Sequence, residues 1–368
     1  MNPWLFADGV NSVPSLTAAA NYKKELTDTI SCIVEREING IYELTMTYPI
    51  DGVLFDDIGL RSLLYVSPDD TTDRQLFRIY RISKPLRGVV TINARHISYD
   101  LAGYVKLPFT ASGLSATLSA LTSSTYPSCP FTFTTTLSKS GSFATVIPYD
   151  IWSLMGGVSG SLIDHWHGLE YDFDNFTVNV TAGLGSNNGV VIEYGKNITQ
   201  LLQEENSGTM ITGICPYYYN ETDGLVTISG AVIDGSVSWP FDIYKPVDLT
   251  DKFQSKPSAA QLQLAATAYL LESNIGNPKL TLDVDFVPLW QTLEYKNDAR
   301  ERVSLGDTVT VRFTKLGVDA TARAVAYTYD CLKEKYRKIT IGSAKADLAQ
   351  VIRRMIGKEI YDNHEAWD

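Results

Sequence analysis

The side chains best suited to chemistry are concentrated in the segment LIDHWHGLEYDF, residues 162–173. His165 and His167 are separated by a single residue in a chain that has only 4 histidines. Side chains at positions i and i+2 of a β-strand point to the same face, so on a strand these two imidazoles could bind one zinc ion together. A zinc site would need at least one more protein ligand.

A third ligand is available upstream, where His96 and Asp100 form an HxxxD pattern. The order HxxxD followed by HxH resembles that of the zinc endopeptidases of the lysostaphin type, which cleave peptidoglycan cross-links. This resemblance implies that His96, Asp100 and His167 bind zinc and that His165 assists the attacking water. On one continuous strand, however, Asp100 would lie about 13 Å from His96, so the strand would have to end between them.

We therefore keep the zinc peptidoglycan endopeptidase as an alternative. The main prediction is a protein that is not an enzyme and has no catalytic residues, metal ligands or cofactor. The acidic pair Asp69 and Asp70 lies in a loop-like stretch and is expected to be solvated.

Charge and composition narrow the classes of partner and compartment. The chain has 42 acidic and 31 basic residues, a net charge of −11, whereas a surface that holds nucleic acid needs clustered Lys and Arg. DNA could still pass beside such a surface without being retained. The sequence has no signal-peptide pattern and no apolar run long enough to span a membrane. The 4 cysteines include no CxxC pair, as expected for reduced thiols of a protein made in the cytoplasm.

Most of the chain has the pattern of short strands, which indicates an antiparallel barrel or sandwich. Residues 42–52 alternate up to Pro49, and residues 169–180 predict a hairpin around Asp174 and Asn175. A small-residue helix is expected over 113–124. Further strands are predicted at 88–101, 279–290, 307–313, 320–330 and 336–343.

Two more helices are predicted in the second half. Within residues 257–278, Ser258 can cap a helix and Gln261 can complete a capping box. Another helix begins at Ser343 and carries one apolar stripe. Such a stripe more often packs on its own domain than on a partner chain, but its place near the end of the sequence makes a partner more frequent than is usual. The residues of this hypothetical docking stripe are Leu348, Val351, Ile352, Met355 and Ile356.

Several segments together resemble the prophage tail protein family, also called phage minor structural or tail-associated lysin proteins. DFDNFTVNV and GSNNGVVIEYGKNITQLLQEEN, within 172–206, resemble its central hairpin and strand-turn. YELTMTYPIDG, ARHISYDL, the segment 248–289 and VSLGDTVTVRF with the strands after it resemble its other marked elements, in the same order. The resemblance extends from about residue 40 to about residue 345. Many relatives carry basic residues where this chain has TAGLGSNNG, residues 181–189.

The resemblance implies a mainly β fold with some α, a multidomain tail hub similar to the baseplate hub of contractile phages. It implies two β-barrel domains per chain with inserted α/β domains, assembled as a homotrimer. In this interpretation His165 and His167 are polar strand residues, and Trp166 packs nearby. The expected division is a discontinuous first barrel at 1–100 and 300–345, an inserted α/β domain at 101–195, a second barrel-like domain at 196–299 with a helix at 258–273, and a C-terminal helix and tail at 343–368.

The function that the resemblance implies is structural. Such a hub closes the distal end of the tail tube, forms part of the DNA channel without binding DNA specifically, and anchors tip or receptor-binding components. Its expected partners are further copies of itself, the distal tail protein, and other tail tip or fibre proteins. The expected location is the tail tip of the virion, after synthesis in the cytoplasm of the bacterial host. A cell-wall carbohydrate-binding tail protein is a further alternative.

Overall fold

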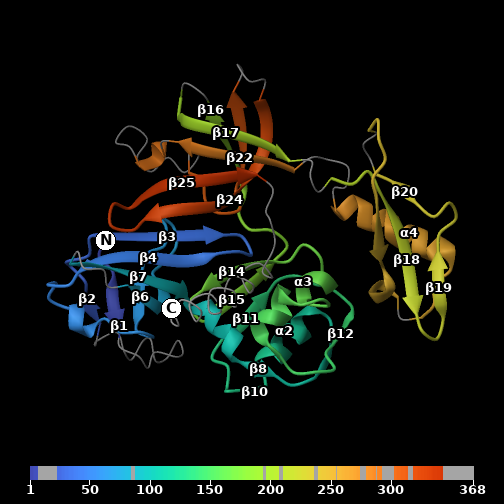
Figure 1. Cartoon of the computed structure of the whole chain (residues 1–368), viewed down its shortest axis with the longest axis horizontal. Helices are drawn as coiled ribbons and strands as arrows, with labels where there is room; N and C mark the ends of the chain where they lie inside the picture. The colour runs from blue at the N-terminus through green and yellow to red at the C-terminus, as the bar shows by residue number, and fades with distance from the viewer. Residues whose placement is uncertain are drawn as a thin grey trace, which may run out of the picture. The chain divides into compact units, whose positions relative to one another are not determined.

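The structure is a computed structural model that describes residues 1–6, 23–83, 88–193, 196–206, 210–235, 239–253, 255–273, 279–286, 288–291, 302–313 and 318–342. The chain forms two compact units (Figure 1). Unit 1 comprises Met1–Leu202 together with the part that begins at Asp283, and unit 2 comprises Gln203–Leu282. Strands predominate in both units, so the prediction of a mainly β chain with some α is confirmed.

The largest sheet has 13 strands in the order β17-β22-β25-β24-β3-β4-β7-β6-β5-β1-β2, with β23 pairing to β24 and β16 to β23. Two short helices, η2 (Phe55–Asp57) and η6 (Leu289–Gln291), lie outside it. The strands are β1 (Trp4–Phe6), β2 (Lys24–Glu25), β3 (Ser31–Glu37), β4 (Tyr42–Pro49), β5 (Leu63–Val66), β6 (Gln75–Ser83), β7 (Val89–His96), β16 (Asn187–Glu193), β17 (Ile198–Asn206), β22 (Lys279–Phe286), β23 (Thr308–Phe313), β24 (Val318–Asp330) and β25 (Lys335–Gly342).

The core of this sheet is formed by the apolar residues that alternate with polar ones along its strands. In β4, Leu44, Met46 and Tyr48 are buried, while the residues between them are more exposed. The antiparallel pairing of β24 with β3 brings residues 326–330 beside the N-terminal strands (Figure 1). The strand pairings form an open path from β17 to β2, so closure into a barrel stays a prediction.

Residues 97–181 form a smaller α/β region of unit 1. The predicted helix is confirmed as α2, and its Leu114, Leu118 and Leu121 form one buried stripe. The predicted hairpin is confirmed as β14 and β15, but its two turn residues are Asn175 and Phe176. The turn falls there because Asn175 adopts a positive φ of 49°, which asparagine tolerates. The other elements are η3 (Ile97–Gly103), β8 (Val105–Lys106), β9 (Thr110–Ser112), β10 (Thr125–Tyr126), β11 (Thr132–Thr135), β12 (Ser142–Ala144), β13 (Tyr149–Asp150), η4 (Ser153–Gly157) and α3 (Leu162–His165); α2 is Leu114–Thr122, β14 is Glu170–Asp174 and β15 is Thr177–Thr181.

Unit 2 is a four-stranded sheet packed on one helix (Figure 1). It consists of β18 (Gly213–Asn220), β19 (Gly224–Thr227), β20 (Ile233–Asp234), β21 (Tyr244–Asp248), η5 (Thr250–Lys252) and α4 (Ala259–Ser273). The predicted helix and its capping box are confirmed: Gln261 Oε1 accepts from Ser258 N at 2.9 Å, and Ser258 Oγ accepts from Gln261 N at 3.3 Å. Its core contains Ile214, Tyr218, Ile228, Leu249, Leu262 and Ala266.

Two predictions are not tested by the structure. The C-terminal helix and its docking stripe at 348–356 lie outside the described residues. The structure separates residues 203–282 as a unit, and the predicted four-part division of the chain stays a prediction. Across the described ranges, no helix is long and apolar enough to cross a membrane.

Candidate functional site

His96, the first residue of the HxxxD pattern, belongs to the core. It ends β7, is fully buried and stacks on the ring of Tyr42 with 4.3 Å between ring centroids. Its Nδ1 accepts a hydrogen bond from Ser98 N at 3.2 Å, and its Nε2 lies 3.2 Å from Gln75 Oε1. Burial, with a smaller contribution from the Arg36 charge, holds the pKa of His96 well below its usual range. The side chain is therefore a neutral imidazole with both ring nitrogens engaged inside the protein.

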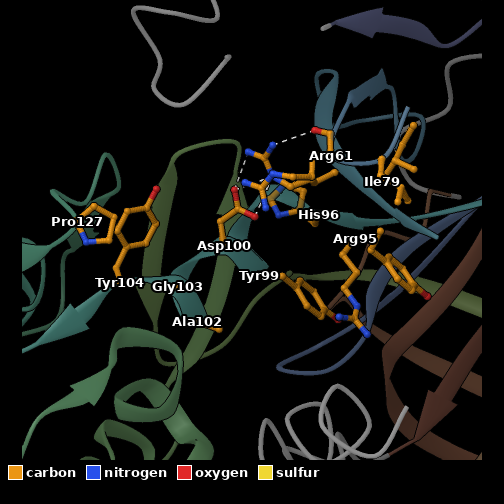
Figure 2. Close-up of a pocket in the computed structure, with 13 residues that line it drawn as sticks. Arg61, Ile79, Arg95, His96, Tyr99, Asp100, Ala102, Gly103, Tyr104 and Pro127 are labelled. Atoms are coloured by element: carbon orange, nitrogen blue, oxygen red, sulfur yellow. Dashed lines mark hydrogen bonds and ion pairs between the residues drawn. The ribbon is translucent and has the colours of Figure 1, made fainter. Parts of the chain in front are cut away.

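Asp100 is engaged by a different partner. The strand does end at His96, as a shared metal site would require, and Asp100 follows in η3. Its two carboxylate oxygens accept from Arg78, with Nε–O distances of 3.0 and 2.9 Å, and Arg78 Nη2 lies 2.7 Å from Oδ2 (Figure 2). A bidentate guanidinium of this kind occupies the oxygens that a metal ion would need.

The interpretation of His165 and His167 as strand residues is wrong. His165 ends the short helix α3 and His167 lies in the turn before β14. His165 N donates to Ser161 O at 2.9 Å, which makes the backbone helical, and Gly168 turns the chain with a φ of +76°. The i, i+2 rule for a strand therefore does not apply to this pair. The expected packing of Trp166 is confirmed, because it is buried and stacks on Phe143.

Within the part of the chain that the structure describes, no group of three or more His, Cys, Asp or Glu side chains is placed to hold a metal ion. His96, Asp100, His165 and His167 are all in that part, so the geometry implied by the endopeptidase resemblance is absent from it. The spacing of these residues was compatible with a site, but the pairing of Asp100 with Arg78 and the burial of His96 could not be read from spacing.

The structure does contain a cavity beside His96 and Asp100, with a volume of about 700 Å³ (Figure 2). It lies against β6, β7 and η3. The Arg95 guanidinium lies 4.3 Å from the ring centroid of Tyr80 and 5.6 Å from that of Tyr99, and its Nε is 3.3 Å from Glu43 Oε1. The cavity is lined by Leu60, Arg61, Arg78, Ile79, Tyr80, Arg95, His96, Tyr99, Asp100, Ala102, Gly103, Tyr104 and Pro127.

Chemically, this cavity presents guanidinium and phenol groups. Arg78 and Arg95 each contact a carboxylate of the same chain, which offsets their positive charge. Burial raises the pKa of Tyr104 further above neutral pH. The arrangement supplies hydrogen-bond donors for a polar ligand. Sequence reasoning missed it because the lining residues come from separate segments, and the only available signal was the alternation of Arg78 and Tyr80 on one strand.

The prediction that Asp69 and Asp70 are solvated is wrong. Asp69 is 6% exposed and accepts from the backbone N–H of Thr71 and from Tyr327 Oη at 2.8 and 2.9 Å. Burial opposes its ionisation, but the hydrogen bonds from Thr71 and Thr72 and the nearby Arg36 charge together outweigh burial and lower the pKa of Asp69. Asp70 accepts from Tyr336 Oη at 3.0 Å. The two carboxylates therefore attach the loop after β5 to β24 and β25.

Polar contacts also attach the β14–β15 hairpin to the large sheet. Asn39, in the turn between β3 and β4, donates to Leu169 O at 2.8 Å and accepts from Tyr171 N at 2.9 Å. At the hairpin tip, Gln75 Oε1 accepts from Asn175 N at 2.6 Å. These contacts hold the α/β region against the sheet.

In unit 2, the face of the sheet opposite α4 exposes apolar and aromatic side chains. Tyr218 of β18 is buried on the helix side, whereas Tyr219 is 54% exposed. Leu225, the partner of Tyr219 on β19, is 63% exposed. Tyr244 of β21 is 39% exposed and donates to Asp234 Oδ1 at 2.7 Å. This sheet face is a candidate interaction surface of unit 2.

The fold is that of a mainly β chain in which several ion pairs join segments distant in sequence. The family model Prophage_tail, described as prophage endopeptidase tail, matches residues 240–352. The structure is similar to prophage tail protein gp18 from Listeria monocytogenes EGD-e, with a TM-score of 0.60 and 15% identity over 97% of this chain and 99% of that one. The predicted resemblance to prophage tail proteins is thus confirmed.

Two further solved structures are similar over nearly their whole length. The tail protein from Neisseria meningitidis MC58 has a TM-score of 0.57 and 10% identity, over 95% of this chain and 98% of that one. The 43 kDa tail protein of prophage MuSo2 from Shewanella oneidensis has a TM-score of 0.58 and 11% identity, over 94% and 99%. No curated protein is significantly similar to the chain in sequence.

Proposed function

We propose that this chain is a structural tail hub protein of a phage or prophage. Copies of it form a ring, expected to be a homotrimer, that closes the distal end of the tail tube. The ring forms part of the DNA channel and anchors tip or receptor-binding components. It works at the tail tip of the virion, after synthesis in the host cytoplasm.

The observation that carries this proposal is the end-to-end likeness to the Listeria prophage tail protein, which covers 97% of this chain and 99% of that one. A match of both whole lengths supports a common overall architecture rather than one shared domain. The net charge of −11 supports a channel surface that repels DNA phosphates instead of retaining them. The internal pairing of buried charges supports a mechanical role.

The test is the mass of the purified chain in solution together with its shape. Light scattering across a range of concentrations should give three times the mass of 40.7 kDa, and negative-stain electron microscopy should show rings with a central opening. If the chain is a monomer alone and also stays a monomer when mixed with the distal tail protein, the hub proposal is wrong. A cyclic trimer requires a head-to-tail interface on each chain, so one substitution there should dissociate all copies.

The description of the matched family favours one second candidate, a peptidoglycan endopeptidase. The matched segment at 240–352 contains none of the residues of the zinc hypothesis, and His96 and Asp100 are occupied inside unit 1. Equilibrium dialysis against zinc and digestion of purified peptidoglycan separate the two functions. About one tight zinc per chain, with hydrolysis that His167→Ala abolishes, would establish the enzyme.

The exposed Tyr219 and Tyr244 in unit 2 favour a third candidate, binding of cell-wall carbohydrate, because aromatic rings present flat apolar faces. Sedimentation with purified cell walls tests it. Retention of the chain that Tyr219→Ser and Tyr244→Ser both weaken would support a receptor-binding role beside, or in place of, the hub.

A further inference from the structure

Two buried thiols lie directly opposite each other in the large sheet. Cys32 is in β3 and Cys331 follows the last residue of β24, and their exposed fractions are 0% and 2%. The antiparallel register pairs Ile33 with Asp330, so the next pair along the two strands is Cys32 with Cys331. Cys331 N donates to Cys32 O at 2.9 Å.

This position is close to the geometry of a disulfide. Directly opposite residues of an antiparallel pair have Cβ atoms about 4.5–5.5 Å apart, and a disulfide needs about 3.5–4.5 Å. The remaining approach is small, and one partner lies at the end of the paired stretch. Cys331 is the first residue of the turn between β24 and β25, not a residue in the middle of a strand.

We propose that Cys32 and Cys331 are a modification site, which forms an intramolecular disulfide when the folded chain meets an oxidised low-molecular-weight thiol. One protein thiolate attacks the small disulfide, which releases one small thiolate and leaves a mixed disulfide on the protein. The second protein thiolate attacks the protein sulfur of that mixed disulfide and releases the other small thiolate. The two protein thiols lose two protons and two electrons in all, and the electrons reduce the small disulfide.

Burial controls the rate of this reaction. The hydrogen bond with Cys331 and burial raise the pKa of Cys32, which keeps it protonated and unreactive in the closed sheet. A small thiol reagent would reach the pair through the turn that begins at Cys331, because Lys333 and Glu334 in that turn are exposed. Met1, whose amino group donates to Cys331 O at 2.9 Å, is 55% exposed and must move with the turn. Oxidation should therefore be slow, and faster under conditions that loosen the turn.

The cross-link would join the N-terminal part of unit 1 to its C-terminal part. Closing so long a loop restricts the unfolded chain, which stabilises the folded one. A protein made in a reducing cytoplasm and released on a virion would acquire this bond after release. That timing rests on the proposed function, whereas the bond itself rests only on the sheet.

The test uses the full chain with Cys129→Ser and Cys215→Ser, so that only the pair remains. After incubation with oxidised glutathione, we expect no free thiols, a monomer whose mass is lower by two hydrogens, and a linked peptide containing both cysteines. Thermal unfolding should shift upward by several degrees and return on reduction. A matched control with Cys32→Ala in addition should keep one thiol or a mixed disulfide and show no upward shift.

Free thiols that persist after long exposure just below the unfolding temperature would overturn the proposal. So would disulfides that form only between chains, or a linked monomer that unfolds at a lower temperature than the reduced form. The result is independent of the ring, because a monomeric chain can still form the bond. Failure of the hub and failure of the disulfide are therefore distinguishable.

Discussion

Glu170 and Arg323, 153 positions apart in sequence, form a bidentate ion pair between β14 and β24, with Nη1–Oε1 2.7 Å and Nη2–Oε2 3.0 Å. Arg323 Nη2 also donates to Leu184 O at 2.9 Å, and Glu170 Oε2 accepts from Leu184 N at 2.6 Å. The hydrogen bond with Glu170 raises the pKa of Arg323. One pair of side chains therefore attaches the hairpin and the segment after it to the large sheet.

Replacing Glu170 by Gln should destabilise unit 1 by about 1–3 kcal/mol. Removing one member of a buried pair costs about 3–5 kcal/mol, and the 31% exposure of the Arg323 side chain lowers the expected loss. Urea unfolding followed by tryptophan fluorescence measures it. The exposed pair of Lys24 and Asp57 is the control, because Asp57→Asn should change the free energy of unfolding by less than about 0.5 kcal/mol. Equal losses in the two variants would contradict the structural role assigned to Glu170.

His96 predicts a dependence of stability on pH. Its pKa in the folded chain lies well below the unfolded value of about 6.5, so below pH 6.5 the unfolded chain binds a proton that the folded chain does not. Stability therefore falls as pH falls, by about 1.4 kcal/mol per pH unit until the folded pKa is reached, and is unaffected by His96 above about pH 6.5. Urea unfolding at several pH values between 7 and 5 measures the slope.

The variant His96→Gln should be less stable at pH 7 but lose this slope between pH 7 and 5. His167→Gln, in the turn before β14, is the matched control and should keep it. If His96→Gln retains the full slope, the acid sensitivity comes from other groups and the buried neutral state of His96 is not its cause.

Alanine substitutions at two glycines with similar φ angles should lower the free energy of unfolding by different amounts. Gly185 has a φ of +75°, and a Cβ there would lie 2.1 Å from the carbonyl carbon of Gly306. Gly189 has a φ of +72°, and a Cβ there would meet nothing within 4 Å. Gly189→Ala should cost about 1–2 kcal/mol for the left-handed backbone alone. Gly185→Ala must also separate two backbone segments, so it should cost at least about 3 kcal/mol or prevent folding. Similar unfolding midpoints for the two variants would contradict the close approach.

The sequence was sufficient for the elements whose pattern is local. The capping box of Ser258 and Gln261, the stripe of α2 and the alternation of β4 all depend on neighbours within one turn or one strand, so spacing predicts them. The hairpin was also predictable, although its turn was placed one residue too early because Asp174 and Asn175 are both good turn residues.

Contacts between distant segments were not predictable in this way. Asp69 and Asp70 have the composition of a solvated loop, yet Tyr327 and Tyr336, about 260 positions later, donate to them. The zinc hypothesis could not be judged from spacing for the same reason, because nothing near Asp100 in sequence indicates that Arg78 will contact both of its oxygens. Spacing predicts which groups could meet, but the tertiary fold decides which partner each one finds.

The apolar stripe of the predicted C-terminal helix gives a last prediction, which concerns assembly. Val351→Asp with Ile352→Asp places two charges on the stripe, and burying them at an interface would be costly. If the stripe docks the next tip component, this variant should fold with an unchanged unfolding temperature but fail to enter tail tips, as measured by immunoblotting of purified particles. Gln350→Asp, on the opposite side of such a helix, is the control and should assemble normally. Normal assembly of the double variant would show that the stripe has no docking role, and a lowered unfolding temperature would show that it packs on its own domain instead.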